Sequence, residues 1–219
     1  HIEQGPVLEG KDLQIGVVSG IQGICHLDVV VLGEEAHAGT TPRRSRKDAL
    51  SAAVGIIAAL EELTTDDGDT IRFTVGRCEV SPGSPNTVPG RVHFTIDLRH
   101  PDSEIIQSMR RRIDEVAAAK AGACIVAVSD NLYVPPTTFE PSVIGAIRDS
   151  AKNLGYEYLY MPSGAGHDAM HLNAICGAGM IFVPCLGGIS HNEAESATPA
   201  DLAAGARVLT DTLVRLANS

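Results

Sequence analysis

Long apolar stretches, basic runs and paired cysteines are all missing from this sequence of 219 residues. No apolar run approaches the roughly 18 to 20 residues that a membrane-spanning helix needs. The amino-terminal segment also lacks the basic region followed by an apolar one that marks a secretory signal. We therefore expect a cytoplasmic protein that makes no contact with a membrane.

Positive charge is scarce. The formal net charge is -10 at pH 7, and the longest run of Lys and Arg is the three residues from Arg110 to Arg112. A surface of this sign repels the phosphate backbone over most of its area. Nucleic acid is therefore excluded as the expected partner.

The cysteines are odd in number and widely spaced, with no CxxC pair. Their neighbours are mostly apolar, which favours buried free thiols over disulfides. They are Cys25, Cys78, Cys124, Cys176 and Cys185. The sequence also starts at His1 without a methionine, inside a stretch that resembles a motif, so we expect that an upstream segment was removed or left out.

Hydrophobic residues make up 44% of the chain, enough to bury a sizeable core. Period-2 and helical spacings predict a strand over 24–33, a helix over 47–63, an antiparallel strand pair over 70–80 and 87–99, a helix from Ser103 to Gly122 and a strand over 124–128. Ser103 is a candidate cap for its helix. The order β-α-β-β-α-β predicts a ferredoxin-like unit within a domain spanning 21–136.

The pattern changes after Pro135 and Pro136. Helices are predicted over 143–154, 168–174 and 199–217, and strands over 158–161 and 180–184. Such alternation is typical of an α/β layer fold with a parallel sheet, to which the strand 15–18 could also belong. Residues 1–20 and 137–219 would then form one domain, into which 21–136 is inserted.

Two sequence patterns resemble catalytic or metal-binding sites, but their residues support that interpretation poorly. His167 and His171 in HDAMH are superficially like the zincin HExxH, but Asp168 reaches poorly to a zinc-bound water and no third ligand is obvious. Glu34 and Glu35 could split into ligand and base, although a solvated strand end explains them better.

Three further positions remain open on local pattern alone. The turn SGAGHD (163–168) follows a predicted strand and opens a predicted helix, so it is either structural or binds a small anion. His1 and His191 could each be a metal ligand or a surface histidine, and His191 follows a strand end where α/β enzymes often place catalytic groups.

Five segments together resemble one family. They are HIEQGPVLE (1–9), GEEAHAGTTPRRSRKDAL (33–50), NTVPGRVHFTIDLRH (86–100), SGAGHDAMHL (163–172) and GISHNEAES (188–196), in the order expected for hydantoinase/carbamoylase amidohydrolases. This family includes N-carbamoyl-L-amino acid hydrolases, allantoate amidohydrolases and β-ureidopropionases. The resemblance covers essentially the whole chain.

The resemblance implies a metal site that this chain holds only in part. His1 and His191 are similar to the family's histidines on the first and second of two divalent metals, which suits zinc, or manganese or cobalt. The HxD pair, the bridging Asp and the Glu that acts as general base all lie upstream of HIEQG in the family. These 219 residues are therefore expected to be inactive alone.

The resemblance also implies substrate contacts. Gln4 would face the ureido or amide group, and Asn86 and Arg99 would grip the substrate carboxylate. His37 would be the catalytic donor to the developing oxyanion, a role typically filled across a dimer by the partner's small domain. The turn at Gly164 and Gly166, with His167, would supply contacts on the other side. Closure of the inserted domain is expected to bring His37 and Arg99 to the site together.

The fold expected from the resemblance is an α/β catalytic-domain remnant of the di-zinc aminopeptidase type, with an inserted ferredoxin-like α+β domain that acts as lid and forms a homodimer. The expected function is metal-dependent hydrolysis of a linear amide or ureido C–N bond. Two alternatives remain: an aminoacylase or peptidase with the same metals and lid, or a non-catalytic dimerisation or binding module.

Overall fold

The computed structural model describes residues 1–218, which divide into two compact units. Unit 1 consists of residues 1–22 together with the segment from 136 onward, and unit 2 consists of residues 23–135. No helix within residues 1–218 is both long and apolar enough to cross a membrane.

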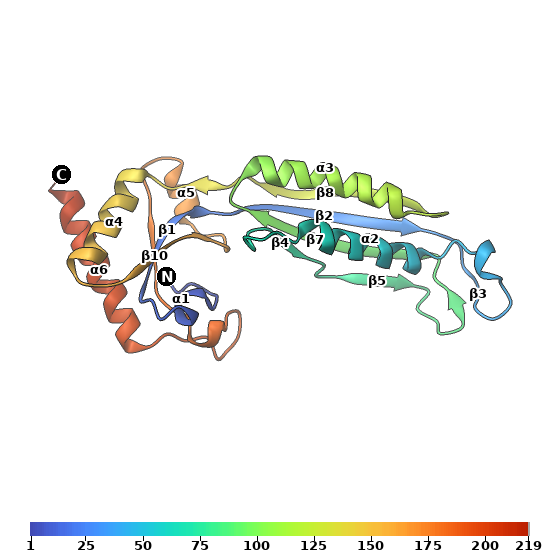
Figure 1. Cartoon of the computed structure of the whole chain (residues 1–219), viewed down its shortest axis with the longest axis horizontal. Coiled ribbons are helices and arrows are strands. Elements are labelled where there is room, and N and C mark those ends of the chain that lie inside the picture. Colours follow the sequence, from blue (N-terminus) through green and yellow to red (C-terminus); the bar gives the residue numbers. More distant parts are fainter. Residues whose placement is uncertain (219) are drawn as a thin grey trace. The chain divides into compact units, whose positions relative to one another are not determined.

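Unit 2 contains an antiparallel sheet with two helices running along it (Figure 1). The strand order is β4-β7-β2-β8, and β5 also pairs with β7. The elements in chain order are β2 (Gly23–Leu32), β3 (Ala36–His37), η1 (Arg43–Ser45), α2 (Ala49–Thr64), β4 (Arg72–Thr74), β5 (Cys78–Ser81), β6 (Thr87–Val88), β7 (Arg91–His100), α3 (Ser103–Lys120) and β8 (Ile125–Val134).

The sheet of unit 2 differs from the prediction in two places. The strand predicted over 70–80 is two short strands, β4 and β5, because the chain leaves regular pairing between them. The strand predicted over 87–99 is also divided: residues 87–88 pair with β3, and β7 begins at Arg91. The division at 89–90 brings β3 and β6 together as a separate small ribbon.

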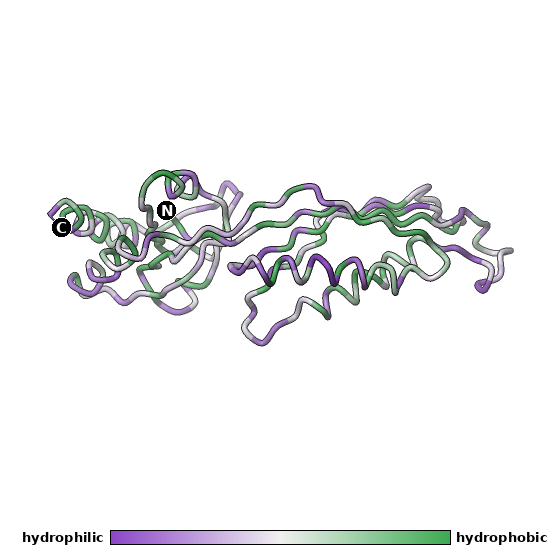
Figure 2. The backbone as a smooth tube through the Cα atoms, turned by 90° about the horizontal axis from the view of Figure 1, so that it is seen from above, coloured by the Kyte–Doolittle hydropathy of each residue, from purple (hydrophilic) through white to green (hydrophobic). Residues whose placement is uncertain are grey.

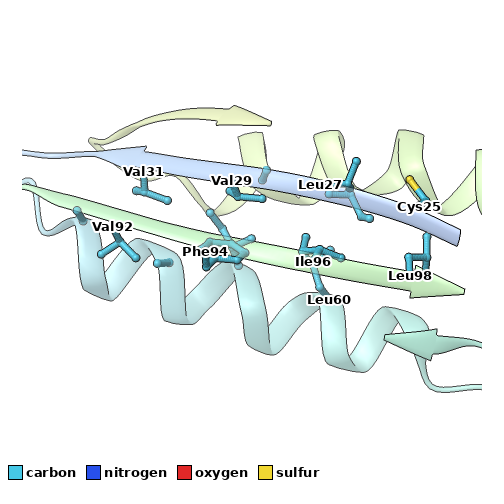
Figure 3. Packing of buried hydrophobic residues seen from close by; sticks show 14 of the residues in the cluster. Cys25, Leu27, Val29, Val31, Leu60, Val92, Phe94, Ile96 and Leu98 are labelled. Atoms are coloured by element: carbon cyan, nitrogen blue, oxygen red, sulfur yellow. The ribbon is translucent and has the colours of Figure 1, made fainter. Parts of the chain in front are cut away.

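The core of unit 2 lies between the sheet and its helices (Figure 3). Alternate residues of β2 and β7 point into it, and α2 contributes Leu60. Each such aliphatic or aromatic side chain contributes about 1.5–3 kcal/mol through burial. The inward residues drawn in Figure 3 include Cys25, Leu27, Val29, Val31, Val92, Phe94, Ile96 and Leu98.

Aspartates begin both long helices of unit 2. Asp48 accepts hydrogen bonds from the amides of Leu50 and Ser51 at the start of α2, at 3.1 and 3.0 Å. Asp102 accepts from the Glu104 amide at 2.8 Å. The predicted cap at Ser103 is wrong by one residue, since Asp102 fills the N-cap position and Ser103 is the first helical residue.

Unit 1 has a small mixed sheet. Its elements are α1 (Val7–Gly10), β1 (Ile15–Ile21), β9 (Thr137–Thr138), α4 (Pro141–Asn153), β10 (Tyr158–Ser163), α5 (Ala169–Asn173), β11 (Met180–Phe182), η2 (Leu186–Gly188) and α6 (Pro199–Ala217). Helices α4 and α6 pack against Ile15 and Val17 on one face of β1. The other face of the sheet packs against Leu8 and Phe139.

The predicted parallel sheet is only partly correct. Strand β1 is parallel to β10, but it is antiparallel to β9 and β11. A parallel connection needs a crossover that returns along the sheet. The helix in the connection from β10 to β11, α5, has only five residues, and β11 enters the sheet antiparallel to β1.

All five cysteines are free, as predicted, but they are not uniformly buried. Cys25 and Cys185 are buried, Cys124 is half-buried, and Cys78 and Cys176 are exposed. The apolar neighbours therefore predicted burial poorly, since Cys78 lies on the short strand β5 and Cys176 lies after α5.

Candidate functional site

The first residues of the chain run parallel to the segment that follows β11. The backbone nitrogen of His1 donates to the Ile181 carbonyl at 2.9 Å, and the Val183 amide donates to the His1 carbonyl at 3.0 Å. The Glu3 amide then donates to the Val183 carbonyl at 2.9 Å. Residues from the two ends of the sequence thus form one edge of the unit 1 sheet.

The surroundings of the His1 ring determine which of its nitrogens carries the proton. Nδ1 lies 2.8 Å from the carbonyl oxygen of Ile2, which can only accept a hydrogen bond. Nδ1 therefore carries the proton and Nε2 keeps its lone pair. A ring held in this way by a backbone carbonyl is typical of histidines that bind metals.

His167 lies against His1, with ring centroids 4.7 Å apart. Its Nε2 is 3.1 Å from the buried hydroxyl of Ser163. That hydroxyl lies 2.8 Å from the Ala165 carbonyl and has a single proton to donate, so His167 Nε2 must donate to it. Burial lowers the pKa of His167, against the opposing effect of Asp168.

In the predicted anion-binding turn, one backbone amide is already engaged in a hydrogen bond within the turn. The Ala165 amide, between Gly164 and Gly166, donates to the Ser163 hydroxyl at 3.1 Å. Fewer amides are therefore available to a ligand than the sequence pattern predicts. Ser163 was not among the predicted site residues, although it stands at the start of the SGAGHD motif.

His191 and Gln4 both adopt a left-handed backbone, with φ of 55° and 63°. The Glu195 carboxylate accepts from the Ser190 hydroxyl at 2.7 Å and from the His191 amide at 3.1 Å. These contacts, the hydroxyl first, hold the pKa of Glu195 below its usual range. The approach of His1 and His191 to one dinuclear centre stays a prediction.

Within residues 1–218, no group of three or more His, Cys, Asp or Glu side chains is arranged to hold a metal. The zincin pattern also finds no support. His167 precedes helix α5 and bonds to Ser163, so it does not share a helical face with His171.

His37 belongs to the small β3–β6 ribbon of unit 2. Its Nδ1 accepts hydrogen bonds from the amides of Gly39 and Thr40, both at 3.1 Å. A nitrogen that accepts carries no proton, so the neutral ring must carry its proton on Nε2. Figure 2 shows the segment around this turn in hydrophilic colours, at the end of unit 2 that Figure 1 labels β3.

Asn86 lies beside His37. The Ala38 amide donates to the Asn86 carbonyl at 2.9 Å, and His37 pairs with Thr87. The Asn86 side-chain oxygen accepts from the Ser84 hydroxyl at 2.7 Å. The structure thus brings together two of the predicted substrate contacts that are 49 positions apart.

Arg99 lies near the far end of β7. Its Nε and Nη2 donate to the two carboxylate oxygens of Asp97 at 2.9 and 2.7 Å, and His26 lies 3.3 Å from the same carboxylate. Burial alone would raise the pKa of Asp97, but the Arg99 guanidinium outweighs it, helped by His26, and lowers that pKa. The Asp97–Arg99 pair is therefore present as a two-point ion pair.

Arg99 and His37 cannot meet one substrate within a single chain. The eight-residue step from Arg91 to Arg99 along β7 spans about 26 Å, and the β3–β6 ribbon lies beyond the Arg91 end. The expectation that one lid delivers both groups together is therefore wrong. The expected supply of His37 across a dimer stays a prediction.

The Glu34–Glu35 pair behaves as a solvated strand end. Both residues are exposed, and Glu34 pairs with Lys47 at 3.1 Å. The interpretation as solvent-exposed carboxylates therefore fits this pair better than that of a metal ligand with a general base.

Comparisons of sequence and of structure with known proteins point to the same group of hydrolases. A model of peptidase family M20/M25/M40 matches residues 1–215. An N-carbamoyl-L-amino-acid amidohydrolase of Rhizobium meliloti is 40% identical over 95% of this chain and 51% of its own length. An allantoate amidohydrolase of Bacillus subtilis is 34% identical over 99% of this chain and 53% of its own length.

A solved amidase of the hydantoinase/carbamoylase family from Burkholderia multivorans superposes with a TM-score of 0.93 at 41% identity. It covers 97% of this chain, which covers 52% of the amidase. The chain thus spans about half the length of the relatives it matches.

Proposed function

Because this chain belongs to peptidase family M20/M25/M40 and is similar throughout to hydantoinase/carbamoylase amidohydrolases, we propose that it is the substrate-gripping part of a metal-dependent amidohydrolase. The bond hydrolysed is the linear amide or ureido C–N bond of N-carbamoyl-L-amino acids, or of ureido acids such as allantoate or β-ureidopropionate. The names of the similar proteins support this substrate class.

The observation that carries the proposal is the state of His37. Two backbone amides occupy its Nδ1, so its Nε2–H can only donate. A donor of this kind stabilises the negative oxygen that develops when a carbonyl is attacked, an effect of roughly 10²- to 10³-fold in rate. His37 is accordingly the proposed catalytic residue of this chain.

The remaining contacts divide between the two ends of the substrate. Arg99 and Asn86 bind the carboxylate, and Gln4 faces the ureido group. The turn at Gly164 and Gly166, with His167, contacts the substrate from the opposite side.

Two divalent metals, zinc or else manganese or cobalt, fit this chain in part. The Nε2 lone pair of His1 is suited to one metal, and His191 is the proposed ligand of the other. When bound, the two ions would lower the pKa of the attacking water and polarise the carbonyl. The described residues form no cluster of three or more candidate ligands. The general base and the other ligands are therefore proposed to lie outside residues 1–218, and the chain alone is proposed to be inactive.

Unit 2 is the proposed ferredoxin-like lid and dimerisation domain. Its edge strand β8 exposes Ile125, Leu132 and Tyr133, and an uncovered apolar edge strand favours association. The separation of Arg99 from His37 also calls for two copies. We therefore propose a homodimer in which each site takes Arg99 from one copy and His37 with Asn86 from the other.

Product analysis tests the proposal, because carbamoyl and ureido acids release ammonia whereas N-acetyl amino acids and dipeptides release only free amino acids and, for the former, acetate. The protein as its gene encodes it, loaded with zinc or manganese, is offered N-carbamoyl-L-amino acids, allantoate, N-acetyl amino acids and dipeptides. Release of ammonia from a carbamoyl or ureido acid is expected. Cleavage of only N-acetyl amino acids or dipeptides would favour the aminoacylase or peptidase alternative, and no turnover of any substrate would favour a non-catalytic module.

A further inference from the structure

We propose that Arg46 is a positioning residue that holds the turn of residues 38–41 and, through it, the ring of His37. The inference rests on the proposed function only where it concerns catalysis. Its structural part concerns unit 2 alone.

Arg46 bonds to the backbone on both sides of this turn. Its Nε donates to the Thr41 carbonyl at 2.9 Å, and its Nη2 donates to the Ala38 carbonyl at 2.6 Å. The two nitrogens lie on one edge of the planar guanidinium, so two near-parallel bonds fix the distance between the two carbonyls. The Thr41 amide closes the turn from within by donating to the His37 carbonyl at 3.1 Å.

Arg46 and His37 bind opposite ends of the same peptide group. The carbonyl of Ala38 and the amide of Gly39 belong to one rigid plane and point in opposite directions. Arg46 holds the carbonyl end, and the amide end donates to Nδ1 of His37. Rotation of this peptide would break both bonds together, so the guanidinium sets the direction of the amide that orients the ring.

The turn is also shaped to receive the ring. A Cβ added at Gly39 would lie 3.3 Å from Cε1 of His37 and 3.5 Å from Nδ1. The first distance is tighter than an ordinary van der Waals contact. Residue 39 is therefore glycine at the point where the ring packs against the backbone.

Arg46 has no competing ionic partner among residues 1–218, whereas its neighbour Lys47 pairs with Glu34. The guanidinium is half-buried, and both of its hydrogen bonds go to backbone carbonyls. A lysine could not reproduce this grip, because an ammonium has no planar pair of donors.

Amide hydrogen exchange and ¹⁵N spectra of the 219-residue chain test the structural part. Arg46→Ala should speed exchange of the Gly39 and Thr40 amides at least tenfold and shift the ring nitrogens of His37, and methylguanidinium should partly reverse both changes. Arg46→Lys should behave like Arg46→Ala. Arg44→Ala is the matched control, because it removes the same charge from an exposed position in the same loop and should change neither signal.

Unchanged exchange at Gly39 and Thr40, with unchanged His37 ring signals, in Arg46→Ala or Arg46→Lys would overturn the inference. If Arg46→Ala does not fold, Arg46→Lys tests the inference by itself, since lysine keeps the charge and the aliphatic stem.

Turnover tests the catalytic part in the protein as its gene encodes it. Arg46→Ala should lower kcat roughly tenfold to hundredfold with little change in KM, since misplaced groups lose rate more than binding. The loss should be absent when His37 is already replaced by asparagine, because the two residues act through one group. Equal further loss in the double variant would contradict this step. If His37→Asn itself leaves turnover unchanged, the proposed function of His37 fails while the exchange result still decides the positioning role.

Discussion

Each of three histidines in this chain has its protonated nitrogen selected by a near neighbour. Ile2 requires a proton on Nδ1 of His1, the Gly39 and Thr40 amides exclude one from Nδ1 of His37, and Ser163 requires one on Nε2 of His167. One residue type therefore offers a metal ligand in the first case and a hydrogen-bond donor in the second.

His37→Asn separates the structural and catalytic contributions of His37. An asparagine side-chain oxygen can accept from the amides two and three residues onward, so the turn should persist. Stability to denaturant should change by less than about 0.5 kcal/mol, as for a surface position. Turnover should fall roughly 10²- to 10³-fold, because the donor on Nε2 is lost. A variant with wild-type turnover would show that His37 only caps the turn.

The residue types of the site could be predicted from sequence, but their partners could not. The motifs gave His1, His37 and Arg99, because these side chains stand in recognisable strings. The protonation of the rings depends on carbonyls and amides whose positions follow from the fold. Ser163 and Arg46 were missed for the same reason, since each acts through backbone groups that carry no sequence signal.

At the scale of elements, the junction after β2 depends on Gly33. A Cβ at this position would lie 2.0 Å from the Lys47 carbonyl, just before α2 begins. Gly33→Ala must push β2 and α2 apart and should cost more than about 2 kcal/mol of unfolding free energy. Gly55→Ala is the matched control within α2, where nothing lies within 4 Å, and it should stabilise by about 0.5–1 kcal/mol. Denaturant titration measures both, and equal effects of the two substitutions would refute the close contact.

The connection from α2 to β4 is held by an aspartate. Asp66 accepts from the amides of Ile71 and Thr70 and from the Thr70 hydroxyl, and these bonds lower the pKa of Asp66 to about 2. The folded pKa lies below the ordinary aspartate value of 3.8, so the stabilisation is present above about pH 4 and is lost as the pH falls toward 2. Asp66→Asn should therefore be less stable than the wild type at pH 7, with the difference shrinking below pH 4. A difference that does not vary with pH would contradict this account.

The long helices and strands could be predicted from hydrophobic periodicity, whereas the short ones could not. Helices α2, α3 and α6 lie within about two residues of their predicted starts, because three or more turns of helical spacing define them. Strand β11 was found, but not its antiparallel direction, because direction depends on how the short α5 connection turns. The departure of residues 87–88 from the sheet also had no periodic signal.

At the scale of the whole molecule, shared sites predict complementation between two impaired variants. Arg99→Ala and His37→Asn proteins are mixed and allowed to exchange subunits. Half of the dimers are then mixed, and one of the two sites in each has both native groups, so about a quarter of wild-type activity should return. A site built within one chain would give no recovery. Sedimentation should show a dimer, and a monomer at all concentrations would also exclude this arrangement.

The most direct test of the central claim compares the protein as its gene encodes it with its Arg99→Ala variant. The kcat/KM of each is measured for an N-carbamoyl-L-amino acid and for the same compound with its carboxylate replaced by an amide. The account predicts that the variant loses roughly tenfold to hundredfold on the carboxylate substrate, since charge-assisted hydrogen bonds are lost, and loses little on the amide. The wild type should already be poor on the amide. Near-normal kcat/KM of Arg99→Ala on the carboxylate substrate would instead reduce Arg99 to the ion partner of Asp97 and contradict the claim that this chain grips a ureido acid by its carboxylate.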